Sequence, residues 1–377
     1  MAYGIYIHLP FCLQNCKYCH FITVPLHQDK IERYRAAVLK EIALYAASET
    51  DIISVDSIYF GGGTPSLLPA DYIETILDTC RESFHISSGC EISMEVNPGT
   101  IRNETSSSYK KAGVNRISIG AQSFNDLELK TIGRLHTAGE ISQSLRILRE
   151  NGFENINMDL LLGLPFQTAE TWRNTLNVLP GLDISHVSLY MLDLDEPCPL
   201  SKSVADGSLA VADDDSIADL YLDAIDVLDS FGFHQYEISN FSRPGYACRH
   251  NLKYWLRERV IGFGLGSHSF DGHSRYANFF EMEEYLLSLE KGRLPVLWRK
   301  VLKEKEALEE TLFLGLRLNQ GIQWSGLKRK YRDERLKMYE SLLHQLVSEG
   351  LVEWKESNVR LTPAGMLLSN EIFQQFV

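Results

Sequence analysis

Short apolar runs alternate with longer amphipathic stretches over the first two-thirds of the chain. The short runs, rich in β-branched and aromatic residues, predict strands at 4–9, 57–60, 91–96, 116–120, 156–161 and 186–191. The longer stretches have apolar residues at helical spacing and predict helices at 28–45, 70–84, 139–151, 169–178 and 216–231. Strands that alternate with helices are typical of a parallel sheet. We therefore expect an α/β fold, a partial (β/α)6 TIM-like barrel, with a doubly wound open sheet as the alternative.

The pattern changes after about residue 295, where a Leu-Pro step and a charged run at 303–306 indicate a junction. Two helical patterns follow, then a hairpin at 351–354 and 358–361, and Thr362 opens a last helix. Helix, helix and hairpin are the order of a winged-helix-like α+β domain. We expect two domains, at 1–300 and 301–377.

Glycine-rich and polar turns follow five of the predicted strands directly. They lie at 8–12, 61–65, 97–99, 121–123 and 163–165. In a parallel sheet the carboxyl ends of the strands share one edge, and active residues gather in the loops there. We therefore expect these five turns to meet on one face of the molecule.

The first of these turns contains a cluster of cysteines. Cys12, Cys16 and Cys19 form a C-x3-C-x2-C run. Zinc sites normally have four ligands in paired C-x2-C units, and no second pair exists here. Thiolates also hold [4Fe–4S] clusters, and three of them leave one iron open to an external ligand. We predict such a cluster, and expect the thiols of Cys80, Cys90 and Cys198 to be core or surface groups.

This cysteine loop, with Tyr18 before the third cysteine and the GGGTP turn at 61–65, resembles the radical S-adenosylmethionine (SAM) superfamily. The resemblance implies that the open iron chelates SAM. An electron from the cluster then cleaves the sulfonium and yields a 5′-deoxyadenosyl radical. The protein positions the reactants and excludes water.

Further residues resemble the oxygen-independent coproporphyrinogen III oxidase family, which holds two SAM molecules. The resemblance implies that Tyr6, Gly62 and Glu95 bind the cluster-bound SAM. For a second SAM, or whatever replaces it, the implied residues are Tyr18, Gly63, Thr64, Gln122, Arg134 and Asp159. The residue types suit these roles, because glycine permits close backbone approach, carboxylates accept hydrogen bonds from ribose, and arginine binds carboxylates. No catalytic residue is assigned.

Two departures from that oxidase family change the expected function. Phe21 stands where the oxidase has a fourth cysteine, and the oxidase has a long segment ahead of its cluster that helps to enclose the porphyrin. Here the cluster motif begins at Cys12. We therefore do not expect oxidase activity.

The chain instead resembles the HemW-type branch, whose members are haem chaperones. The resemblance rests on the Cys-x-Phe ending at 19–21 and on the segments at 236–241, 248–255 and 262–269. Its His-Asn-x-x-Tyr-Trp run implies a haem-associated segment near 248–269, with His250, Tyr254 and Trp255 as haem-binding residues and Cys248 as a second candidate ligand. We expect His268 either to have a structural role or to lie near the SAM pocket.

The implied function is that of a cluster- and SAM-carrying chaperone that delivers haem, its cargo, to respiratory haem proteins, with an electron donor for the cluster. The implied fold is a radical SAM partial barrel whose C-terminal domain covers the open side. Coproporphyrinogen oxidation, a two-SAM radical methyltransferase, and a zinc-bearing winged helix that binds DNA remain as alternatives.

Composition and charge narrow the range of partners and cellular compartments expected for the protein. The chain has 37 Lys and Arg against 50 Asp and Glu, a net charge of −13, which argues against a nucleic-acid partner. The odd count of seven cysteines disfavours a disulfide scaffold and suits a reducing cytosol. No apolar run reaches the roughly 18 residues of a membrane span, and no signal peptide is recognisable. We expect a cytoplasmic protein and leave peripheral membrane contact and oligomeric state open.

Overall fold

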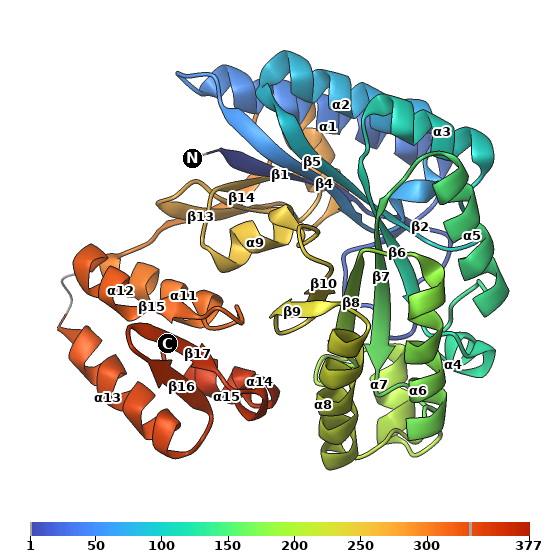
Figure 1. The fold of residues 1–377 in the computed structure, drawn as a ribbon. Coiled ribbons are helices and arrows are strands. Elements are labelled where there is room, and N and C mark those ends of the chain that lie inside the picture. Colours follow the sequence, from blue (N-terminus) through green and yellow to red (C-terminus); the bar gives the residue numbers. More distant parts are fainter. Residues whose placement is uncertain (1, 332–333) are drawn as a thin grey trace.

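Six parallel strands form the centre of the sheet in the computed structural model, which describes residues 2–331 and 334–377 (Figure 1). They are β1 (Tyr3–Leu9), β4 (Ser54–Gly62), β5 (His85–Val96), β6 (Arg116–Gln122), β7 (Asn155–Leu162) and β8 (His186–Met191). Every predicted strand is present, and most are longer than predicted. They pair in chain order, all in parallel. This order lacks the reversal of a doubly wound sheet, so the partial barrel is confirmed and the open-sheet alternative is wrong.

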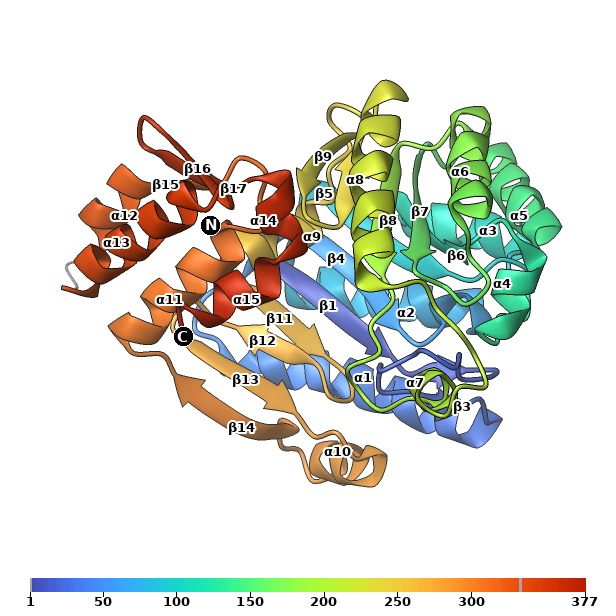
Figure 2. The same ribbon diagram turned by 90° about the horizontal axis from the view of Figure 1, so that it is seen from below.

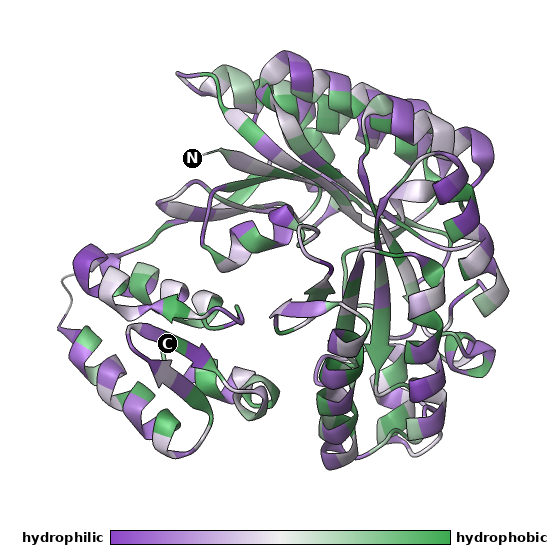
Figure 3. Ribbon diagram, in the orientation of Figure 1, coloured by the Kyte–Doolittle hydropathy of each residue, from purple (hydrophilic) through white to green (hydrophobic). Residues whose placement is uncertain are grey.

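The six parallel strands curve into an open arc, and the outer helices cover its convex side (Figure 1). Apolar and polar residues alternate along these strands, so both kinds are visible in the arc (Figure 3). In β7, Met158 and Leu160 belong to the apolar core beneath the outer helices, whereas Asn157 and Asp159 are hydrogen-bonded to each other inside the arc. The elements that follow the strands are α1 (Gln28–Ser48), α2 (Ala70–Ser83), α3 (Asn103–Ala112), α4 (Asp126–Thr131), α5 (Ala138–Glu150), α6 (Ala169–Val178), α7 (Pro199–Ala205) and α8 (Asp214–Ser230), with 3-10 turns at Pro65–Leu67 and Leu179–Leu182. The interior of the arc is therefore polar.

Two properties of the helices bear on the sequence predictions. The short or polar helices α3, α4 and α7 were not predicted, and α3 shows why, since NETSSSYKKA buries only Ser106, Tyr109 and Ala112. Its place depends on docking between α2 and α5.

Throughout residues 2–331 and 334–377, no helix combines the length and apolar character needed to cross a bilayer.

Later segments extend the sheet at both edges. They are β9 (His234–Glu237), β10 (Asn240–Ser242), α9 (Arg249–Trp255), β11 (Val260–Phe263), β12 (His268–Phe270), β13 (Ser274–Asn278), α10 (Met282–Glu290) and β14 (Val296–Val301). β10 and β9 continue beyond β8, while β11 to β14 continue beyond β1, giving a 12-stranded sheet in the described part of the chain. The helix α9 lies inside the arc (Figure 1).

The C-terminal part is a small α+β unit against the open side of the arc (Figure 2). It comprises α11 (Glu304–Gly315), β15 (Ile322–Gln323), α12 (Trp324–Lys330), α13 (Arg335–Ser348), β16 (Val352–Lys355), β17 (Asn358–Leu361), α14 (Pro363–Leu367) and α15 (Ser369–Gln374). The hairpin is as predicted, but α11 to α13 replace the two helices predicted, because seven-residue α12 is too short to show an apolar period. Leu318 bridges to Glu237 on β9, and Glu310 pairs with Arg275 on β13, so the unit contacts added strands on both sides of the central six.

Two glycines test the packing of this C-terminal unit. A Cβ at Gly365 in α14 would collide with the carbonyl oxygen of Leu351, whereas a Cβ at Gly326 in α12 would lie 3.7 Å from its nearest neighbour, the Cβ of Gln323. We expect Gly365→Ala to lower the free energy of unfolding by about 1–3 kcal/mol. Gly326→Ala should leave it unchanged or raise it by up to about 1 kcal/mol. Urea unfolding measures both, and equal effects would contradict the packing.

Candidate cluster and cofactor site

A cavity of about 390 Å³ opens at the carboxyl ends of the parallel strands. It is lined by most of the residues that the sequence singled out for the cluster and SAM: Cys12, Cys16, Tyr18, Cys19, Gly62, Gly63, Thr64, Glu95, Gln122, Arg134 and Asp159. Four of the five predicted turns contribute to it. The turn at 163–165 does not, because Leu164 is buried in a separate apolar cluster with Ile132 and Leu200. β7 and β8 line the cavity instead, with Asp159 and Tyr190 among others.

The three motif cysteines follow β1 and face this cavity. β2 (Phe11–Cys12) pairs with β3 (Val24–Pro25) and anchors the loop between them. All three thiols are free and half-buried, and burial raises the pKa of Cys12 and of Cys19. Three thiolates on a [4Fe–4S] cluster bind three different irons, so they surround it instead of converging on one ion. Within residues 2–331 and 334–377, no three His, Cys, Asp or Glu side chains are arranged around a single metal ion. These residues fit a cluster.

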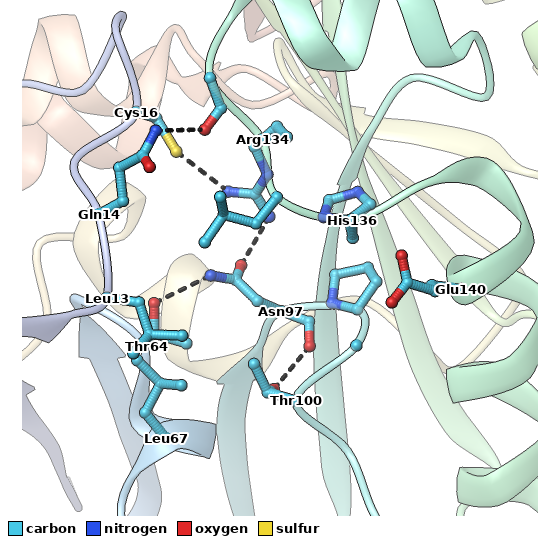
Figure 4. A pocket seen from close by; sticks show the side chains of 14 residues that line it. Leu13, Gln14, Cys16, Thr64, Leu67, Asn97, Thr100, Arg134, His136 and Glu140 are labelled. Atoms are coloured by element: carbon cyan, nitrogen blue, oxygen red, sulfur yellow. Dashed lines mark hydrogen bonds between the residues drawn. The ribbon is translucent and has the colours of Figure 1, made fainter.

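Arg134 is the cation beside the thiols (Figure 4). Its guanidinium donates to the sulfur of Cys16 at 3.5 Å, to the side-chain oxygen of Asn97 at 2.6 Å and to the carbonyl oxygen of Gly120 at 2.6 Å. Arg134, Asn97 and Cys16 also line a second, smaller cavity of about 150 Å³, so they form part of the wall between the two. A cation here stabilises thiolate charge and can also receive a ligand carboxylate.

The glycine turn after β4 brings backbone close to the cysteine loop. A Cβ at Gly63 would lie 2.6 Å from the carbonyl oxygen of Phe11, and a Cβ at Gly61 would lie 2.9 Å from Oε1 of Glu95. Gly62 has a φ of 107°, which favours glycine, and its N–H donates to Oε2 of Glu95 at 3.1 Å. The turn therefore holds Glu95 and leaves backbone groups accessible to a ligand.

Two half-buried carboxyl groups, those of Glu95 and Asp159, share the cavity. Burial, and secondarily the charge of Asp159, raises the pKa of Glu95 to about 7, although Tyr59 donates to Oε1 of Glu95 at 3.0 Å. Burial also raises the pKa of Asp159, which accepts from Ser118 at 3.0 Å and from Asn157 at 2.7 Å. Carboxylates placed in this way suit the hydroxyl, amino and sulfonium groups of SAM.

Sequence reasoning missed three residues of the site. Asn97 donates a hydrogen bond to Thr64 at 2.9 Å and accepts one from Arg134. Tyr59 donates a hydrogen bond to Glu95. Gly120 lacks a Cβ, which leaves room for the guanidinium of Arg134. Asn97 stood in a turn that the pattern had marked, so its position was a usable signal. The other two lie within strands, where only the register reveals them. A register shift between Gly120 and Gln122 accompanies the positive φ of 68° at Gln122.

Tyr6 is not among the residues that line the cavity. Its hydroxyl is hydrogen-bonded to Nδ1 of His8 at 3.1 Å, and its ring stacks on Tyr59 at 6.2 Å between centroids. It therefore supports Tyr59 from inside the arc.

The haem-associated segment forms α9, near the amino ends of the strands. His250 is 1% exposed, and its two ring nitrogens are hydrogen-bonded to Ser57 at 3.0 Å and to Tyr254 at 3.2 Å. Burial lowers the pKa of His250 to about 3. Glu91 accepts from the backbone N–H of His250 at 3.0 Å and binds the thiol of Cys248 at 3.5 Å. Burial raises the pKa of Cys248 to about 12. Both candidate haem ligands are thus occupied with protein contacts.

Aromatic rings connect α9 with the cavity. Tyr59 stacks on His250 with centroids 5.3 Å apart, while its hydroxyl holds Glu95. Trp255 lies beneath Arg317 of the C-terminal unit, 4.3 Å from ring centroid to guanidinium carbon. Tyr254 is half-buried against His250. The segment is therefore clamped between the strands and the C-terminal unit.

The pKa of Glu95 makes a testable contribution to stability. The unfolded chain releases this proton near pH 4.5 and the folded chain near 7, so the free energy of unfolding falls as pH rises through that window. We expect Glu95→Gln to remove the part of this fall that Glu95 contributes, and to raise the free energy of unfolding of SAM-free protein by about 1–3 kcal/mol at pH 8. Glu41, whose pKa burial also raises to about 7, keeps its own part of the fall. SAM binding should weaken in the same variant. Urea unfolding at pH 5 and 8 measures the effect, and an unchanged pH dependence would contradict it.

Comparison with known proteins places the chain in a family. The radical SAM superfamily model matches residues 6–179, and the HemN C-terminal domain model matches 302–368. The chain is 34% identical over 374 residues to the heme chaperone HemW of Bacillus subtilis, covering 99% of this chain and 98% of that protein. Identity to the Escherichia coli heme chaperone HemW is 37% over 270 residues, covering 70% and 69%.

A solved structure agrees with this assignment at the level of fold. Coproporphyrinogen III oxidase (HemN) from Escherichia coli, a radical SAM enzyme, matches with a TM-score of 0.86 and 23% identity, over all of this chain and 90% of that one. The near-complete coverage of relatives above 30% identity decides the family. The chain belongs to the heme chaperone HemW family, within the radical SAM superfamily.

Proposed function

We propose that this protein binds haem and delivers it to haem-accepting proteins, and that it carries a [4Fe–4S] cluster and SAM. One observation carries the proposal: similarity to heme chaperone HemW relatives spans nearly the whole chain. The cavity with three facing thiols and the His-Asn-x-x-Tyr-Trp helix inside the same arc support it. Phe21, 70% exposed at the cavity, weighs against the oxidase because it cannot act as a fourth thiolate.

In this proposal the cavity residues divide between cluster and cofactor. Cys12, Cys16 and Cys19 ligate the cluster. A radical SAM cluster supplies one electron for the cleavage of SAM. The glycine turn and Glu95 bind the methionine and ribose parts, and Arg134 stabilises the thiolate of Cys16. A second SAM would take the other predicted residues, which are Tyr18, Gly63, Thr64, Gln122 and Asp159.

For the cargo, we propose that α9 forms one wall of the haem site. Tyr254 and Trp255 supply aromatic surface. His250 and Cys248 remain the ligand candidates of the family motif, but ligation by His250 first requires one ring nitrogen to lose its partner, either Ser57 of β4 or Tyr254 of α9 itself. That step breaks one hydrogen bond of the buried His250 ring, at a cost of about 1–3 kcal/mol.

The proposal extends to the domains of the chain, its partners and its location. The chain divides into a radical SAM domain at 1–300 and a C-terminal domain at 301–377 that holds Trp255 through Arg317. The partners are haem, respiratory haem proteins as acceptors, and an electron donor for the cluster, in the cytoplasm. A net charge of −13 weighs against nucleic acid as a partner.

Haem binding separates the proposed function from the oxidase. Anaerobically reconstituted protein should bind haem in an absorbance titration and, with coproporphyrinogen, SAM and a reductant, should form no protoporphyrinogen. An authentic oxidase under the same conditions is the control. Steady formation of protoporphyrinogen, or no haem binding by wild-type protein, would overturn the proposal.

The cluster assignment has its own test. Cys16→Ser should lose most of the iron bound after anaerobic reconstitution, because a hydroxyl is a poor replacement for a thiolate ligand. Cys90→Ser is the matched control, since Cys90 is buried in β5 and does not line the cavity. Iron and sulfide analysis compares the two. Equal iron content in both variants would remove Cys16 from the ligand set.

A further inference from the structure

An open aromatic surface lies on the concave face of β12 to β14. His268 pairs with Ala277, which pairs with Trp298, so these three side chains share one face. The neighbouring Tyr276 points to the other face, where its hydroxyl meets that of Tyr45 in α1 at 3.4 Å. His268 and Trp298 therefore face the inside of the arc, the side that holds α9.

His268 is accessible in a way that His250 is not. Its side chain is exposed, and within residues 2–331 and 334–377 no hydrogen bond or ion pair engages its ring nitrogens. The ring meets Trp298 edge-on at 5.8 Å and Phe280 at 6.1 Å between centroids. Partial burial and the charge of Arg275 lower the pKa of His268, so its imidazole is neutral near pH 7. A neutral imidazole with a free lone pair is the form that ligates iron.

Exposed apolar area surrounds this histidine. Trp298 is 37% exposed and Phe280 40% exposed. The glycine turn before β12 packs Phe280 against Ile22, because Gly266 has no Cβ to separate them. Ile22 follows Phe21, which lines the cluster cavity. The surface formed by His268, Phe280 and Trp298 thus adjoins the cysteine loop.

A cationic end completes the surface. Arg275 and Lys300 lie two residues along from Ala277 and Trp298 on the same face, about 7 Å away. Glu310 pairs with Arg275 at 2.7 Å and with Arg257 at 2.8 Å, and Glu306 pairs with Lys300 at 2.7 Å. Three cations thus face two carboxylates, and one positive charge is in surplus. The surface therefore presents an apolar end with a free imidazole and a positively charged end.

We propose that His268 is the axial ligand of the haem cargo, held on this surface with its ring against Trp298 and Phe280 and its propionates toward Arg275 and Lys300. The inference rests on the proposed haem function and names the site that serves it. A flat apolar ring with two carboxylates at one edge matches an aromatic surface that ends in cations. Because α9 ends at the same face, with Arg257 4.5 Å over the Phe270 ring, no rearrangement of α9 is needed.

Titration of reconstituted full-length variants with haem tests the site. His268→Ala should weaken binding about tenfold or more and shift the absorption spectrum, and added imidazole should restore the wild-type spectrum. His273→Ala is the matched control, because His273 is an exposed histidine in the same β12–β13 hairpin, and it should bind as wild type does. Trp298→Ala should weaken binding of both haem and iron-free protoporphyrin, whereas His268→Ala should weaken haem binding far more.

The outcomes are distinct. If His268→Ala binds haem with wild-type affinity and spectrum while His250→Ala does not, the ligand is His250 and the inference falls, although the chaperone function stands. If wild-type protein binds no haem, the proposed function falls as well. Should Trp298→Ala impair only delivery to an acceptor and leave haem binding intact, the surface docks a protein and the haem site is refuted.

Discussion

A network of hydrogen bonds joins buried polar side chains inside the arc, and the rest of the structure depends on this network. Alternate residues of the central strands point into the arc, away from water and from the apolar core. His186 meets Asn157 at 2.6 Å, and Asn157 donates in turn to Asp159 at 2.7 Å and to Ser118. An unpaired group here would cost about 1–3 kcal/mol, so each side chain fixes its neighbours.

The same network joins the two functional regions. The second nitrogen of His186 meets the hydroxyl of Tyr236 at 2.9 Å, which accepts from the backbone N–H of Cys248 at 3.2 Å. Asp159 lies in the cluster cavity and Cys248 begins the haem-associated segment, so a continuous chain of hydrogen bonds connects them. The stack of Tyr59 on His250 is a second connection. The polar interior thus positions α9 relative to the cavity, and the C-terminal unit closes over it through Arg317 and Glu310.

Much of the fold was predictable because its signals are local. Each of the six central strands carries its own apolar run, and a glycine-rich or polar turn follows five of them directly. Some strands outside the central six were not predictable, since β10 and β12 have only three residues each and exist because a neighbouring strand offers its backbone. The polar helix α3 likewise depends on its neighbours.

The sequence by itself determined the chemistry of the cavity, because the spacing of Cys12, Cys16 and Cys19 and the glycine turn at 61–65 are short motifs that carry their own geometry. Only the tertiary structure decided which residues reach it. Asn97 lines the cavity and Tyr6 does not, and neither placement follows from spacing. Likewise, the buried ring of His250 is hydrogen-bonded to Ser57, which is 193 residues away in the sequence. The exposure of a histidine depends on such distant contacts, and no local pattern records them.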